Sequence, residues 1–97
     1  MPKLVVKDQA RTWLVDLRDG ESLLVGRGAA CDLRIETPRA SRKHCEVVAT
    51  DAGHAVRDLG STNGTTLDGE PFQGDAALAD GASIDAAGCT LVYWSTP

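Results

Sequence analysis

Short apolar runs separated by glycine-bearing turns constrain the fold of this chain more than any other feature of its sequence. In runs such as residues 3–7, 12–17 and 44–50, apolar and polar residues alternate with a period of two, which is the period of a half-buried β-strand. Dipeptides that favour tight turns recur between the runs, namely Asp19-Gly20, Asn63-Gly64, Asp68-Gly69, Asp80-Gly81 and Ala87-Gly88. No window keeps a helical stripe of apolar residues free of Gly or Pro, so the pattern predicts an all-β protein.

The spacing of the runs predicts about eleven short strands. They cover residues 3–7, 12–17, 22–26, 31–35, 44–50, 53–59, 65–67, 71–72, 76–78, 82–86 and 89–94. Short strands with a turn every 8–12 residues or so are typical of a β-sandwich of two antiparallel-rich sheets. A helix over residues 75–80 is the main competing assignment, because its alanines favour one. In a sandwich the loops gather at the two ends, so three polar loops, residues 26–31, 36–43 and 60–64, are candidates for binding.

Length and composition indicate a single soluble domain. With 97 residues, 42% of them apolar, we expect a single domain over residues 1–97 with a frayed tail at residues 95–97. No apolar run approaches the ~20 residues of a membrane helix, and no signal-peptide pattern is present, so we expect a soluble, cytoplasmic protein without a membrane partner. The cysteines are odd in number and lack CxxC spacing, so we expect buried core residues at Cys31, Cys45 and Cys89 and neither a disulfide, a metal nor a cofactor.

The distribution of charge is more informative than the net charge of −4. Residues 27–43 carry five basic and two acidic side chains, whereas residues 44–97 carry one basic and eight acidic side chains. A nucleic-acid-binding domain is more often basic throughout, so we expect no nucleic-acid partner. One basic segment on an acidic body indicates a localised anion site, with a chance fluctuation of surface charge as the alternative that composition leaves open.

Three polar segments carry the groups that an anion site needs. Arg27 ends an apolar strand with a planar fork of donors, and residues 41–44 add a hydroxyl, two cations and an imidazole. Residues 58–65 contain Asn63-Gly64, which favours a hairpin with positive φ at both residues, and further hydroxyl and amide groups beyond what a turn requires. A tetrahedral phosphate ester, with about −1.5 to −2 charges at pH 7, suits such a set.

The same segments resemble those of a known family. Gly26-Arg27, Ser41-Arg42-Lys43-His44 and Asp58-Leu59-Gly60-Ser61-Thr62-Asn63-Gly64-Thr65 are similar, in order and separation, to the motifs of the forkhead-associated (FHA) domain, a phosphothreonine-binding β-sandwich of eleven strands. The resemblance covers nearly the whole chain. It implies a non-catalytic phosphopeptide-recognition module of Ser/Thr kinase signalling, whose partner is a phosphothreonine-bearing protein or peptide.

The resemblance also implies a role for each matching residue. Arg27 and Ser41 would bind the phosphate directly, Arg42 would add charge, and Thr62 would supply a further phosphate contact from its side chain or backbone. Asn63 would bond the main chain of the bound peptide. Arg39, two residues before Ser41, would read the residue three after the phosphothreonine and prefer an acidic side chain there.

Three further residues are expected to support the site. Gly26 and Gly64 are structural in either reading of the motifs. His44 is either a phosphate ligand or general base, or a buried side chain that bonds the backbone near Ser41, and the resemblance favours the buried role. Arg34 and Lys43 are expected on a solvated face.

Other classes of function remain as alternatives. Ser41, His44 and Asp58 are the residue types of a hydrolytic triad, but no nucleophile elbow or oxyanion loop accompanies them, so we expect no enzyme. A metal site that combines His44 with the cysteines is disfavoured because His44 and Cys45 are neighbours in one strand and face opposite ways. The remaining rival is an FHA-fold interaction module that works independently of phosphate.

Overall fold

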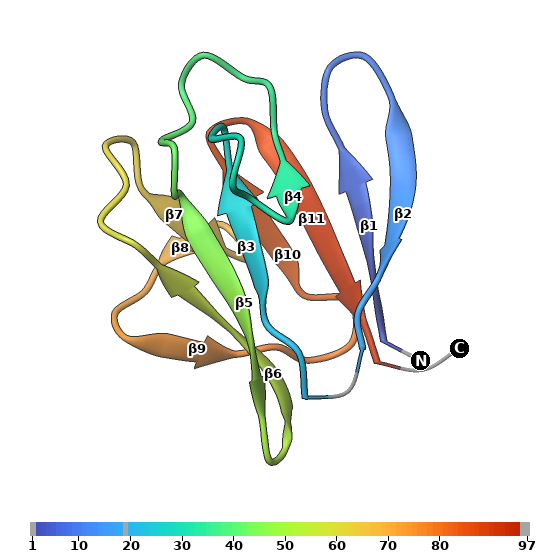
Figure 1. The fold of residues 1–97 in the computed structure, drawn as a ribbon. Coiled ribbons are helices and arrows are strands. Elements are labelled where there is room, and N and C mark those ends of the chain that lie inside the picture. Colours follow the sequence, from blue (N-terminus) through green and yellow to red (C-terminus); the bar gives the residue numbers. More distant parts are fainter. Residues whose placement is uncertain (1, 19, 96–97) are drawn as a thin grey trace.

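The computed structural model describes residues 2–18 and 20–95, and all regular secondary structure in these ranges is β-strand (Figure 1). The strands are β1 (Lys3–Lys7), β2 (Thr12–Asp16), β3 (Leu23–Gly26), β4 (Leu33–Arg34), β5 (Cys45–Thr50), β6 (Gly53–Asp58), β7 (Thr65–Leu67), β8 (Glu70–Pro71), β9 (Asp75–Ala77), β10 (Ser83–Ala86) and β11 (Cys89–Trp94).

The strands form two sheets, which confirms the predicted β-sandwich. One sheet has the order β2-β1-β11-β10-β7-β8 and the other the order β4-β3-β5-β6-β9. Every described pairing is antiparallel except that of β3 with β4. The competing helix over residues 75–80 is not formed, because β9 is used as an edge strand against β6, with Val56 opposite Ala76.

The core lies between the two sheets, and in β1, β10 and β11 alternate residues are buried in it. Leu4 and Val6 of β1 are fully buried, as are Val47 of β5 and Leu91 of β11. Burial of one such side chain stabilises the fold by about 1.5–3 kcal/mol. The other buried apolar residues are Leu17, Val25, Leu33, Ile35, Ala40, Cys45, Val48, Ala55, Val56, Ala82, Ile84, Ala86, Cys89 and Tyr93.

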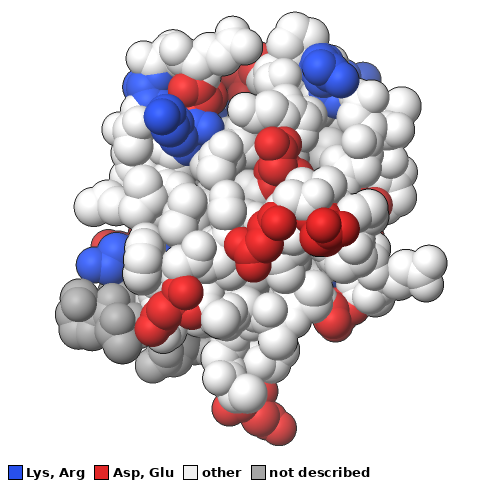
Figure 2. All heavy atoms as spheres, turned by 180° about the vertical axis from the view of Figure 1, so that it is seen from behind, with Lys and Arg blue, Asp and Glu red and all other residues white. Residues whose placement is uncertain are grey.

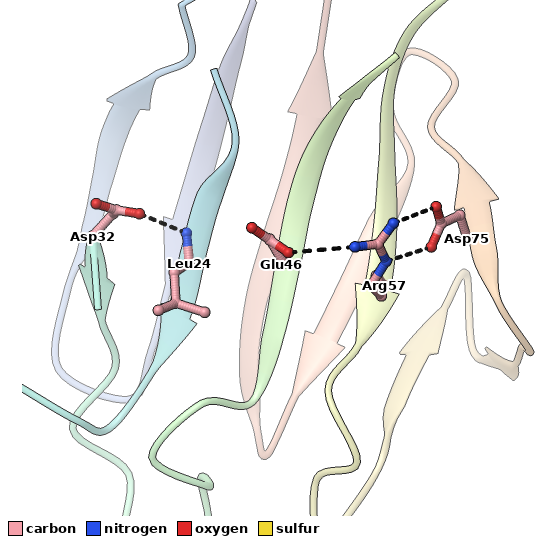
Figure 3. A network of polar contacts seen from close by, with 5 residues as sticks. All are labelled: Leu24, Asp32, Glu46, Arg57 and Asp75. Atoms are coloured by element: carbon pink, nitrogen blue, oxygen red, sulfur yellow. Dashed lines mark hydrogen bonds and ion pairs between the residues drawn. The ribbon is translucent and has the colours of Figure 1, made fainter. Parts of the chain in front are cut away.

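Two predictions about the segment before β5 need correction. Cys31 is partly exposed rather than buried, and its thiol lies 2.9 Å from the carbonyl oxygen of Arg42. The strand expected over residues 31–35 is only two residues long. It begins late because the carboxylate of Asp32 accepts the amide of Leu24 at 2.8 Å, so that a side chain replaces the main chain as partner of β3 (Figure 3).

The predicted turns fall into two groups. Asp68-Gly69 and Ala87-Gly88 join paired strands with positive φ at both residues, 51° and 84° in the first turn and 55° and 89° in the second. Asn63-Gly64 does not close a hairpin, because β6 and β7 belong to different sheets, and only Gly64 has positive φ, at 80°. The hairpin prediction for residues 58–65 is therefore wrong.

The carboxyl-terminal tail, predicted to be frayed over residues 95–97, is ordered at its first residue. Ser95, which we assigned to a frayed tail, donates its amide and its hydroxyl to Asp80 Oδ1 at 2.6 and 2.7 Å. It is therefore held against the turn before β10. Residues 96–97 of that tail, and Asp19 of the predicted Asp19-Gly20 turn, lie outside the described residues.

Three connections lie at one end of the sandwich, at the top of Figure 1. They are residues 27–32 between β3 and β4, residues 35–44 between β4 and β5, and residues 59–64 between β6 and β7. These are the polar loops that the sequence marked as candidates for binding. The sheets beneath them are rigid, so the side chains at this end have a firm base.

Candidate phosphate-binding site

Hydrogen bonds join the three loops to one another. The carbonyl oxygen of Ser41 accepts the amide of Arg27 at 2.9 Å, and the hydroxyl oxygen of Ser41 accepts the amide of Thr62 at 3.0 Å. The side-chain amide of Asn63 donates to the carbonyl of Arg39 at 2.6 Å. The residues that the sequence proposed for one site, far apart along the chain, therefore meet at one end of the fold.

Arg27 leaves the end of β3 next to a glycine that cannot be replaced easily. A Cβ on Gly26 would collide with the carbonyl oxygen of Arg42, so the two loops approach closely only because Gly26 has no side chain. The Arg27 side chain is exposed, and its Nε donates to the carbonyl of Ala40 at 3.0 Å. This bond fixes the guanidinium plane while the two terminal amino groups have no partner among the described residues, so they are available to an oxyanion.

The Ser41 hydroxyl is positioned to donate to a ligand. Its oxygen accepts the Thr62 amide, so the hydroxyl hydrogen is left to a third group. Because that amide is engaged, a ligand contact from Thr62 falls to its exposed side chain. Arg42 is exposed, and its carbonyl accepts the amide of Gly28 at 3.0 Å. The Arg42 side chain therefore leaves the main chain close to the loop that begins with Arg27.

His44 is fully buried and fastens two of the loops. Its Nδ1 accepts the amide of Ser41 at 3.1 Å, and its Nε2 lies 2.9 Å from the carbonyl oxygen of Gly64. Since an amide can only donate and a carbonyl can only accept, the ring is neutral with its hydrogen on Nε2. The imidazole is thus turned to main-chain groups rather than to the Ser41 hydroxyl or to Asp58, and no triad is formed by these three side chains.

Asp58 organises the loop that the hairpin prediction misread. Its carboxylate accepts the Ser61 and Thr65 hydroxyls, each at 2.6 Å, and the amides of Gly60 and Ser61 at 3.0 and 3.1 Å. Partial burial acts to raise the pKa of Asp58, but these hydrogen bonds together outweigh it and hold the pKa below its ordinary value. The sequence singled out the stretch but gave Asp58 no role. The available signal was an Asp two and three residues before Gly60 and Ser61, the spacing of a side chain that accepts main-chain amides.

Arg39 borders a separate hollow at the edge of the site. The hollow has a volume of about 480 Å³ and is lined by Arg39, by the loop before it, by the β1–β2 loop and by the β10–β11 turn. The sequence did not predict that residues 8–10 or 87–89 would lie beside Arg39. The lining of the hollow also includes the buried Ile35 and the acidic residues Asp8 and Glu36.

Positive charge gathers at this end of the molecule without acidic partners. Four basic side chains of the loops are exposed and make no ion pair with a described carboxylate: Arg27, Arg39, Arg42 and Lys43. Seen from behind in Figure 2, basic side chains lie near the end that carries the loops, some of them beside acidic side chains, and further acidic side chains spread over the middle of that face. Such a distribution attracts an anionic group to the loops.

The described residues offer neither a metal-binding cluster nor a membrane-spanning helix. Within residues 2–18 and 20–95, no group of three or more His, Cys, Asp or Glu side chains could hold a metal ion. In the same ranges no helix is long and apolar enough to cross a membrane.

Comparison with known proteins places the chain in a family. The model of the FHA domain matches residues 23–86. The FHA domain-containing protein FhaA of Mycobacterium tuberculosis is 38% identical over 68 residues, which are 70% of this chain and 12% of FhaA. The chain thus spans about an eighth of that relative.

Solved structures agree with this match over almost the whole chain. One structure, described for phosphothreonine-dependent FHA domain interactions, has a TM-score of 0.83 at 33% identity and covers 99% of this chain and 97% of its own. The FhaA FHA domain in complex with the intracellular domain of Rv3910 has a TM-score of 0.81 at 33% identity, with 96% and 99% covered. The eleven-stranded sandwich, the three joined loops and these matches together show that the chain belongs to the FHA domain family.

Proposed function

We propose that this domain binds protein segments that contain phosphothreonine, as a non-catalytic recognition module of Ser/Thr kinase signalling in the cytoplasm. The observation that carries the proposal is the meeting of the Arg27 fork and the Ser41 hydroxyl at one rim, each with donors unused by the protein. A phosphate ester offers three acceptor oxygens and nearly two charges to these donors. The phosphothreonine-dependent interactions described for a solved relative support the same reading.

Each site residue takes a defined part in the proposal. Arg27 grips two phosphate oxygens, Ser41 donates its hydroxyl, and Arg42 and the Thr62 side chain complete the anion site. Asn63 already bonds one main-chain carbonyl, that of Arg39. Its amide oxygen is the group that meets the main chain of an extended peptide.

Arg39 sets the proposed preference beyond the phosphate. Its exposed side chain stands at the mouth of the hollow lined by residues 8–10, 35–39 and 87–89. The carboxylate of Asp8 is turned onto the amides of Ala10 and Arg11, at 2.8 and 2.9 Å, and not onto Arg39. Arg39 is therefore the charge that an acidic residue three after the phosphothreonine would meet.

Fluorescence anisotropy with a library of phosphothreonine peptides and their unphosphorylated copies tests the proposal. We expect phosphate-dependent binding that Arg27→Ala weakens by at least about tenfold, because a charge-assisted bidentate contact is lost. Arg18→Ala is the matched control, since Arg18 is exposed and its only described ion pair is a 4.0 Å contact with Glu21. Equal binding of both peptide forms would support instead the phosphate-independent interaction module.

The preference at the third residue after the phosphothreonine has its own test. Exchange of Asp for Lys at that peptide position should weaken binding to the wild-type domain and have much less effect on an Arg39→Ala variant. An exchange that leaves the affinity of the wild-type domain unchanged removes Arg39 from the proposal and leaves the phosphate site intact.

A further inference from the structure

Arg34 is held in the same way as the proposed phosphate ligand Arg27. It lies on β4, directly opposite Gly26 in the parallel pairing of β3 with β4. Its Nε donates to the carbonyl oxygen of Arg27 at 3.1 Å, just as the Nε of Arg27 donates to the carbonyl of Ala40. Both guanidinium groups are therefore anchored by one nitrogen, and their terminal amino groups have no partner among the described residues.

Other arginines of the chain are used differently. Arg57, on the outer face of the same sheet, bonds both carboxylate oxygens of Asp75 at 2.7 and 2.8 Å and lies 3.7 Å from Glu46, so its charge is matched (Figure 3). Arg11 lies over the Trp13 ring, 4.1 Å from its centroid. Among the described arginines, only Arg27 and Arg34 combine an Nε bond to a main-chain carbonyl with unengaged terminal amino groups.

Neither of the two carboxylates nearest to Arg34 in sequence neutralises it. Asp32 lies two residues before Arg34 and Glu36 lies two residues after it. The Asp32 carboxylate is turned to the Leu24 amide at 2.8 Å (Figure 3). Neither Asp32 nor Glu36 makes a described ion pair with Arg34. The Arg34 guanidinium lies against the main chain of Arg27, so the positive charges of the two residues are carried by neighbouring segments. Like charges without a counter-ion repel one another, and an anion bound near them lowers that cost.

We propose that Arg34 forms a second anion subsite beside the phosphothreonine site and that the natural ligand carries a second acidic group near its phosphothreonine. The inference rests on the proposed function, because the first phosphate brings the peptide to Arg27. The second group is a phosphoryl or carboxylate group within about two residues of the phosphothreonine, since consecutive residues of an extended chain are about 3.3 Å apart. Arg34 has one position fixed by Nε, so it can bind this group with both terminal nitrogens at little cost in side-chain entropy.

The test uses one singly phosphorylated peptide that binds the wild-type domain in the anisotropy assay. Each of the two residues before and the two residues after the phosphothreonine is replaced in turn by alanine, glutamate or phosphoserine. Affinities are measured for the wild-type domain, for Arg34→Gln and for Arg18→Gln, which removes the same charge at an exposed position away from β3 and β4.

At one or more peptide positions, we expect phosphoserine to improve binding to the wild-type and Arg18→Gln domains by about three- to tenfold, which is the size of an exposed charge-assisted contact. Glutamate at the same position should improve binding less. In Arg34→Gln this gain should fall below about 1.5-fold, while the singly phosphorylated peptide, which reports an intact site, keeps its affinity within about twofold. A gain that survives in Arg34→Gln, or the absence of any gain in the wild-type domain, overturns the second subsite. If no singly phosphorylated peptide of the library binds the wild-type domain, the proposed function is overturned, and the subsite with it.

Discussion

Replacement of Asp58 by alanine should destabilise the domain far more than its partly exposed position suggests. The substitution removes the acceptor of four hydrogen bonds, two from hydroxyls at 2.6 Å and two from amides at 3.0 and 3.1 Å. At about 1 kcal/mol of net stability for each bond, the sum is about 4 kcal/mol. Water can replace part of this sum because the loop is partly exposed, so we expect a loss of about 2 kcal/mol.

Urea unfolding followed by circular dichroism measures this loss. With a slope of about 1–1.5 kcal/mol per molar urea for a small domain, the midpoint of Asp58→Ala should fall by about 1.5 M with an unchanged slope. Asp85→Ala is the matched control. Asp85 is exposed and accepts a single turn amide, that of Gly88 at 3.0 Å, so its midpoint should move by less than about 0.5 M. Similar shifts for the two variants would refute the view that Asp58 organises the loop.

The same carboxylate gives the stability a predictable dependence on pH. Hydrogen bonds lower the pKa of Asp58 in the folded state, so between the folded and unfolded pKa values the unfolded chain binds more protons. The contribution of Asp58 is therefore complete above the unfolded value of about 3.9 and is lost as the pH falls through the lower folded value. Asp58→Ala should flatten the acid limb of a stability–pH curve.

Other substitutions test the contacts that join the loops and the burial of the thiols. Gly26→Ala should cost about 3 kcal/mol or more in thermal unfolding, because the new methyl group collides with a main-chain carbonyl; a loss below about 1 kcal/mol would show that the loop yields easily. His44→Ala should lower the free energy of unfolding by about 3 kcal/mol, since it leaves a buried cavity and two unpaired main-chain groups. It should also weaken phosphopeptide binding; unchanged binding would show that the imidazole does not support the site. Burial raises the pKa of Cys45 to about 12 and that of Cys89 to about 11. Mass spectrometry after brief alkylation at pH 8 should therefore find the label on Cys31. Early labelling of Cys45 or Cys89 would contradict the burial of that thiol.

The sequence predicted the fold well because strands and turns depend on local patterns. Alternation with a period of two assigns residues such as Leu4 and Val6 to the core, and the turn dipeptides mark where strands end. His44 could be placed because it begins a buried strand directly after a polar loop. Its two hydrogen-bond partners, Ser41 and Gly64, were both already within the proposed motifs.

The errors arise where a side chain takes the place of a main-chain group as the hydrogen-bond partner. Asn63-Gly64 favours a hairpin locally, but the four bonds to Asp58 lead the chain across to the other sheet. In the same way the Asp32 carboxylate shortens β4. The link between Arg34 and Arg27 depends on the parallel register of β3 and β4, which no local pattern in the sequence specifies.

The way in which the loops are fastened has a consequence for how such a domain can change its ligands. The bonds between loops include main-chain groups of Arg39, Ala40, Ser41, Arg42 and Gly64, together with the side chains of Arg27, Ser41, His44 and Asn63. The side chains of Arg39 and Arg42 take no part in them. Substitutions at these two positions can therefore accumulate at little structural cost, so the charge that the loops present to a partner can change while the bonds that fasten the loops stay in place.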